Sequence, residues 1–214
     1  MTQQCPTVFA VDDDPSVLRA TERLLRSAGF NAEVFNSAQA FLDGSRRDVV
    51  GCVILDLAMP GLDGFQVQQI LSERGGALPI IFLTGRGDIA TSVRAMKHGA
   101  ASFLSKPADA DELLTAVRDA TQRCEIALRE LREIADIQQR LATLTPRERE
   151  VLRHLISGRL NKQIAASLGT VEQTIKVHRA RILRKMRAPT LVNLVRLADR
   201  AGVRAEIPDT RVTH

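Results

Sequence analysis

Five short apolar runs, each followed by a helical pattern, make up the first half of this 214-residue chain. The runs cover residues 7–12, 31–35, 49–55, 79–83 and 102–105. Apolar residues at helical spacing predict helices at 15–28, 37–43, 64–74 and 88–98, and a further helix from Asp109. The runs at 52–55 and 80–83 are apolar throughout, as in strands that are buried on both faces. The repeated strand–helix order therefore predicts a parallel sheet with helices on both faces.

Acidic residues follow two of the predicted strands: Asp12, Asp13 and Asp14 come after the first, and Asp56 ends the third. The carboxyl ends of the strands in such a sheet form the edge where ligands bind. Crowded carboxylates raise one another's pKa unless a cation neutralises them, and an all-oxygen cluster suits Mg²⁺. We therefore predict a metal-assisted phosphoryl site. The alternative is a solvated turn, and for Asp14 a helix cap is favoured because Pro15 follows it.

Two more polar residues end strands at the same edge, Thr84 after the fourth and Lys106 after the fifth. Asp56 could be a nucleophile that forms an acyl phosphate, while Thr84 and Lys106 could contact the phosphoryl oxygens. The predicted Mg²⁺ ligands are Asp13, Asp56 and the backbone carbonyl of Ala58, with Asp12 acting through water. The peptide bond before Pro107 could be cis, although such bonds are usually trans. Without the neighbouring motif, Thr84 would be interpreted as an ordinary core residue.

The second half of the chain has a different pattern. Leu113 to Leu144 contains neither Pro nor Gly, which predicts one long helix that is either a connector or a short coiled coil. Thr145, Pro146 and Glu148 then form a capping box with Pro at the first helical position. Helices are predicted at 146–157, 161–168, 171–186 and 190–201. Within them, Ala165, Gly169 and Ile175 have the spacing of a helix-turn-helix.

The two halves of the chain also differ in net charge. Residues 1–123 hold 12 basic and 15 acidic side chains, whereas residues 124–214 hold 18 and 10, so the halves carry −3 and +8. A basic second half favours contact with a polyanion, although a basic helix can also simply be solvated. The three cysteines have no metal-binding spacing and suggest a reducing compartment. No apolar run reaches the ~18 residues of a membrane span, and the start lacks the pattern of a secretory signal.

The residues at the strand ends resemble the receiver domain of two-component response regulators, over about residues 5–123. The matching segments are Asp12–Asp13, Asp56–Gly64, Thr84–Gly85 and Lys106–Pro107. The resemblance implies a flavodoxin-like fold with strand order 2-1-3-4-5. It further implies Mg²⁺-dependent phosphorylation of Asp56 by a sensor histidine kinase, slow self-hydrolysis without other enzymatic activity, and switching through Thr84 and Phe103. Phe103 lacks the hydroxyl of a switch Tyr, and Ala108 stands where related chains often have Phe.

Residues 140–205 resemble the LuxR-type (FixJ-like) DNA-binding domain, a four-helix domain in which the second helix of the motif enters the major groove. The resemblance implies base-facing positions at Lys176, Val177 and Ala180. It implies phosphate contacts by Asn161, Lys162, Thr174, His178 and Arg181, although His178 alone would be interpreted as an ordinary surface residue. It favours dimerisation through the last helix by Leu191, Leu194 and Val195, of which Leu194 and Val195 could instead pack on the domain's own core.

The combined expectation is a cytoplasmic, phosphorylation-controlled transcription factor. It has a receiver domain at 5–123, a helical linker at 124–142 and a DNA-binding domain at 143–205. Its expected partners are the kinase, a second copy of the chain, a palindromic double-stranded DNA site with half-sites ~34 Å apart, and RNA polymerase. Two alternatives stay open. Asp12–Ser16 superficially fits a haloacid-dehalogenase-type phosphatase with Asp12 as nucleophile, and the acidic site could be vestigial in a DNA-binding protein.

Overall fold

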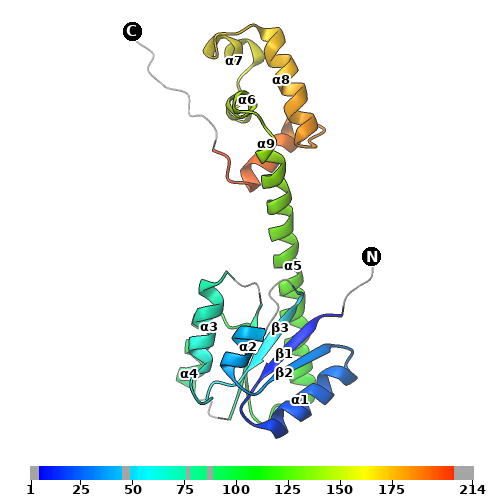
Figure 1. Cartoon of the computed structure of the whole chain (residues 1–214), viewed down its shortest axis with the longest axis vertical. Helices are drawn as coiled ribbons and strands as arrows, with labels where there is room; N and C mark the ends of the chain where they lie inside the picture. Colours follow the sequence, from blue (N-terminus) through cyan, green and yellow to red (C-terminus); the bar gives the residue numbers. More distant parts are fainter. Residues whose placement is uncertain (1–4, 45–48, 76–77, 86–88, 205–214) are drawn as a thin grey trace. The chain divides into compact units, whose positions relative to one another are not determined.

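A computed structural model describes residues 5–44, 49–75, 78–85 and 89–204. The chain forms two compact units, one ending at Arg129 and the other beginning at Glu130 (Figure 1). The first unit contains a five-stranded parallel sheet in the order β2-β1-β3-β4-β5, which confirms the predicted topology. Its strands are β1 (Thr7–Val11), β2 (Asn31–Phe35), β3 (Gly51–Leu55), β4 (Ile80–Thr84) and β5 (Ser102–Ser105).

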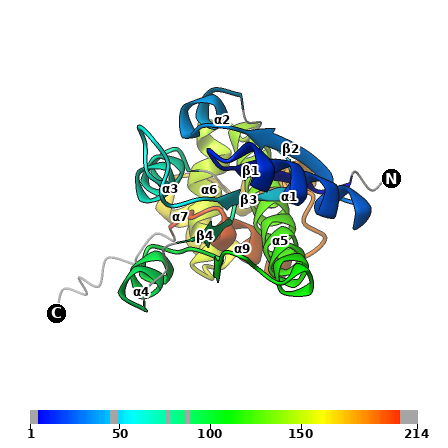
Figure 2. The ribbon, with the colours of Figure 1, turned by 90° about the horizontal axis from the view of Figure 1, so that it is seen from below.

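Helices cover both faces of this sheet (Figure 2). They are α1 (Pro15–Ser27), α2 (Ala38–Gly44), α3 (Gly64–Glu73), α4 (Ile89–Lys97) and α5 (Ala110–Ala142). Because side chains alternate along a strand, Phe9 and Phe82 pack toward α2, α3 and α4, whereas Val8 and Ile81 pack toward α1 and α5. The strands β1, β3 and β4 are buried throughout, as their continuous apolar character predicts.

Observed element limits differ from the predicted ones by one or two residues. Strand β3 begins at Gly51 rather than at residue 49, and β4 includes Thr84 instead of ending before it. Gly51 is held close to β1, since a Cβ atom there would lie 1.9 Å from the carbonyl oxygen of Thr7. The predicted start of a helix at residue 88, and the predicted domain end at residue 205, lie outside the described residues.

The long helix α5 supplies residues to the cores of both units. Cys124 and Leu128 pack with the first unit, and the Cys124 thiol accepts the Gly51 N–H at 3.5 Å. Ile137 and Leu141 pack with the second unit. Burial raises the pKa of the Cys124 thiol, which therefore stays protonated. The segment expected as a linker, 124–142, is thus helical and partly buried. No helix among the described residues has the length and apolar character needed to cross a membrane.

Over residues 130–204, the second unit adds four helices to the end of α5: α6 (Pro146–Ile156), α7 (Asn161–Ser167), α8 (Glu172–Lys185) and α9 (Leu191–Arg200). The predicted capping box at Thr145 is present, because its side chain accepts from the Glu148 N–H while Glu148 accepts from the Thr145 N–H. Ile175, Ile182 and Met186 are fully buried and attach α8 to the core. This attachment fixes which face of α8 is exposed to solvent.

Glu148 also forms a buried ion pair with α8. Its carboxylate is 3% exposed and accepts from the Lys185 amino group at 2.6 Å, and Lys185 donates as well to the Thr143 carbonyl at 3.0 Å. Burial alone would raise the pKa of Glu148, but the hydrogen bonds from Lys185 and Thr145 outweigh it and lower the pKa below its ordinary value. One carboxylate thus caps α6 and joins it to α8.

We predict that Glu148→Gln lowers the stability of the whole chain at pH 7 by about 1–3 kcal/mol, because the Lys185 ammonium group loses its buried negative partner. Since the folded carboxyl has a lowered pKa, its contribution is complete above the ordinary value of 4.5 and is lost as pH falls further. Thermal unfolding followed by calorimetry should therefore show a gap between variant and wild type that narrows below that pH. Glu150→Gln, which affects an exposed ion pair with Arg147, is the control and should change little. A gap independent of pH would contradict this account.

Candidate functional site

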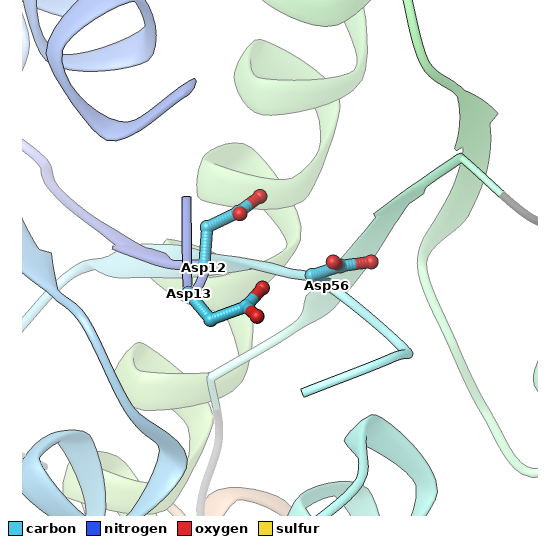
Figure 3. A group of neighbouring side chains, drawn as sticks. All are labelled: Asp12, Asp13 and Asp56. Carbon is cyan, nitrogen blue, oxygen red and sulfur yellow. The ribbon is translucent and has the colours of Figure 1, made fainter. Parts of the chain in front are cut away.

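Three carboxylates gather at the carboxyl end of the sheet. One oxygen from each of Asp12, Asp13 and Asp56 lies within 4.8 Å of the others (Figure 3). The backbone holds two of them, because the Asp12 N–H donates to the Phe35 carbonyl and the Asp56 N–H to the Val11 carbonyl. Asp12 and Asp56 are buried, at 4% and 6% exposed, whereas Asp13 is exposed. The predicted acidic residues therefore meet at one edge.

Lys106 lies between the two buried carboxylates. Its amino group is 2.5 Å from an Asp12 oxygen and 3.1 Å from an Asp56 oxygen. Burial alone would lower the pKa of Lys106, but its hydrogen bonds to both carboxylates outweigh this and raise the pKa. Its backbone N–H donates to the Thr84 carbonyl at 2.8 Å, and its peptide bond with Pro107 is cis. The residues that follow β1 and β3 thus both pair with the one ammonium group that follows β5.

The acidic cluster fits a hard divalent cation. All of its side-chain donors are oxygens, and carboxylates with waters and phosphate oxygens are the ligands that Mg²⁺ accepts in proteins. Lys106 neutralises only part of a nominal charge of −3 on the three carboxylates. The exposed position of Asp13 leaves one side of the cluster open to solvent. The predicted fourth ligand, the Ala58 carbonyl, belongs to an exposed residue whose N–H donates to Asp56 at 3.4 Å.

The other residues predicted near this edge have distinct environments. Asp14 caps α1, as expected, by accepting from the Ser16 N–H at 2.7 Å, and hydrogen bonds from Ser16 lower its pKa. Thr84 is 1% exposed at the end of β4. Phe103 on β5 is half-buried, with its ring centroid 6.4 Å from that of Phe82. The Phe103 ring is therefore partly open to solvent and lies beside the fully buried Phe82.

The predicted DNA-contacting residues lie on α7 and α8. Lys176, Val177, Ala180 and Arg181 are exposed on α8, as is Lys162 on α7. Asn161, Thr174 and His178 are half-buried. Lys176 forms an ion pair with Glu172 at 3.2 Å, so contact with another anion must replace that exposed pair. Val171, at the N-terminal end of α8, is an apolar residue with 66% of its surface exposed. It precedes the predicted base-facing positions on the same helix and was not among the residues predicted to contact DNA.

One predicted dimer contact is wrong. Leu194 is fully buried in the core of its own unit, so its side chain cannot meet a second copy. Leu191 is half-buried against the same core. Val195 is 37% exposed, and Val192, which sequence reasoning missed, is 62% exposed. Helical periodicity places Leu191 and Leu194 on the core side and Val192 and Val195 beside each other on the other side, a signal that the sequence contained.

Comparison with known proteins identifies a family for each of the two parts of the chain. The family model of the response regulator receiver domain matches residues 8–118, and that of the luxR family of bacterial regulatory proteins matches residues 142–198. Nodulation protein W of Bradyrhizobium diazoefficiens is 42% identical over 92% of this chain and 87% of its own length. Transcriptional regulatory protein FixJ of the same organism is 41% identical over 92% and 96%. The solved structure of response regulator StyR has a TM-score of 0.82 and 45% identity, covering 92% of this chain and 99% of that one. The chain therefore belongs to the response regulators, and it joins a receiver domain to a LuxR-family DNA-binding domain.

Proposed function

We propose that phosphorylation of Asp56 by a sensor histidine kinase controls how this transcriptional regulator binds DNA. The observation that carries the proposal is the position of Asp56, a buried carboxylate at the end of β3 that already contacts the Lys106 amino group at 3.1 Å. A carboxylate held beside a fixed cation can act as a nucleophile toward phosphorus while that cation receives the charge of the phosphoryl oxygens. The structure of the second unit supplies the DNA-binding output.

The chemical step is a transfer of one phosphoryl group. A carboxylate oxygen of Asp56 attacks the phosphorus of a phosphohistidine on the kinase, and the phosphorus–nitrogen bond breaks. The electron pair returns to the imidazole nitrogen, which takes up a proton from solvent. Lys106 then pairs with a phosphoryl oxygen, and the Thr84 hydroxyl donates to another. Mg²⁺ held by Asp12, Asp13, Asp56 and the Ala58 carbonyl would neutralise further charge during this transfer.

The acyl phosphate is removed by water, which attacks phosphorus and releases the Asp56 carboxylate. This self-dephosphorylation is the only hydrolytic activity that we propose. A phosphatase that used Asp12 as its nucleophile is less well supported, because the chain matches the receiver and luxR family models and such an enzyme has no use for a DNA-binding domain. Steady turnover of p-nitrophenyl phosphate would favour that alternative, whereas a stoichiometric phosphoryl label supports the receiver function.

Phosphorylation would act through the polar and aromatic residues next to Asp56. As Thr84 moves toward the phosphoryl group, the half-buried Phe103 ring fills the space that it leaves, beside Phe82. A difference of a few kcal/mol between the two forms is enough to shift their populations. The phosphorylated form dimerises, and exposed Val192 and Val195 of α9 are apolar positions suited to that contact. Two copies of α8 then read a palindromic site in double-stranded DNA and regulate RNA polymerase in the cytoplasm.

We predict that Asp56→Asn abolishes the increase in DNA affinity that acetyl phosphate and Mg²⁺ produce in the wild type, because the amide cannot accept a phosphoryl group. The measurement is a binding titration on a selected DNA site, with and without the phosphodonor. Asp43→Asn, at an exposed position on α2, is the matched control and should keep the response. An undiminished response in Asp56→Asn would contradict the mechanism. Loss of the response in the wild type on removing Mg²⁺ would support the metal site.

A pair of substitutions on α8 should separate base contacts from phosphate contacts. Lys176→Ala is expected to weaken binding to the selected site by about 1–3 kcal/mol and to reduce its preference over random DNA. Arg181→Ala should weaken binding to both DNAs about equally and reduce the salt slope by about 1. Fluorescence anisotropy over a range of salt concentrations measures both effects. The control is Arg153→Ala, at an exposed position on α6. If Arg153→Ala weakened binding to the selected site as much as Lys176→Ala, the assignment of α8 as the DNA-contacting surface would be contradicted.

A further inference from the structure

The segment that follows Asp56 is closed against the start of α3. The Gly64 N–H donates to the Leu57 carbonyl at 3.1 Å, which ties the first helical residue to the strand end. Asp63 caps the helix by accepting from the Gln66 N–H at 2.8 Å, and the Gln66 side chain accepts from the Asp63 N–H at 2.8 Å. The first turn of α3 is therefore a fixed surface against which the backbone of Asp56 and Leu57 rests.

Gly64 is buried at this contact, and it leaves no room for a side chain. A Cβ atom there would lie 2.8 Å from the carbonyl oxygen of Asp56, 3.0 Å from the Cα of Leu57 and 2.9 Å from the Cε1 of Phe82. Two of these three neighbours are backbone atoms, which cannot rotate away as the end of a flexible side chain can. An added methyl group must therefore push apart the first turn of α3 and the backbone that carries the proposed phosphoacceptor.

The need for glycine at this position is a matter of space rather than of backbone conformation. Gly64 is not among the described glycines with positive φ, so an alanine could adopt its backbone angles. Gly61, in the same segment, differs from Gly64 in both backbone conformation and available space. Its φ is +86°, and a Cβ atom there would have no neighbour within 4 Å. Gly85, which follows Thr84 at the same edge, also has open space and an ordinary φ. Gly85 is thus a matched glycine without the steric contact.

We propose that Gly64 is a positioning residue for Asp56. Its missing side chain lets α3 approach the Asp56 carbonyl, and this approach holds the carboxylate toward Lys106 and the neighbouring carboxylates. Because the Ala58 carbonyl lies on the same segment, the position of Gly64 would govern two of the proposed Mg²⁺ ligands at once. The inference deepens the proposed function of this site and rests on it. Residues that orient metal ligands from outside the coordination shell change metal affinity by about 10- to 100-fold when substituted.

The test is the Mg²⁺ affinity of the full chain, measured by isothermal titration calorimetry well below the unfolding temperature. Gly64→Ala is expected to weaken Mg²⁺ binding by about 10-fold or more and to slow labelling by acetyl phosphate, while the far-ultraviolet circular dichroism stays unchanged. Gly85→Ala should keep wild-type Mg²⁺ affinity. Gln66→Ala removes the cap hydrogen bond without adding an atom near Asp56, so it should lower the melting temperature but keep the affinity.

A second variant keeps the test decisive if Gly64→Ala folds poorly. Adding Phe82→Leu removes the aromatic neighbour and leaves the two backbone contacts, so the double variant should fold but still bind Mg²⁺ weakly. Wild-type affinity in either folded variant would overturn the proposal. Failure of both variants to fold would overturn it too, because the role of Gly64 would then be structural. If the wild type itself bound no Mg²⁺, the proposed function would fail first and this inference with it.

Discussion

The contact of one lysine amino group with two buried carboxylates is the interaction on which the receiver site depends. Lys106 reaches Asp12 and Asp56 from the end of β5, so three strand ends meet at one charge cluster. Charges removed from water are costly unless they are paired, and losing one partner of a buried pair costs more than the pair contributes. The site is therefore held in place by the same charges that the proposed phosphoryl transfer would use. A dianionic phosphoryl group on Asp56 would add negative charge beside the Lys106 amino group, which already contacts that carboxylate.

The DNA-binding unit shows the same dependence of function on packing. Ile175, Ile182 and Met186 are fully buried, and they fix the rotation of α8 about its own axis. With that rotation set, the helical period leaves Lys176 and Val177 exposed. The Glu148–Lys185 pair joins the cap of α6 to the end of α8, so a single buried carboxylate supports the geometry of the exposed face.

Much of the fold could be predicted because its signals are local and periodic. Continuous apolar runs identified the buried strands, and a parallel sheet brings residues after each strand to one edge, so Asp12, Asp56 and Lys106 could be placed together from the sequence alone. Features that depend on contacts between distant residues could not be predicted. The Glu148–Lys185 pair, for example, joins residues 37 positions apart. The steric role of Gly64 depends on the path of the Asp56 backbone, which no pattern in the sequence describes.

The most direct test of the central claim is peptide-resolved mass spectrometry of the intact chain after exposure to acetyl phosphate and Mg²⁺. The site geometry predicts one phosphoryl group per chain, stable in acid and labile in base, on the peptide that contains Asp56. A chain that gains no phosphoryl group, or that carries it on a peptide without Asp56, would contradict the role assigned to the carboxylate beside Lys106.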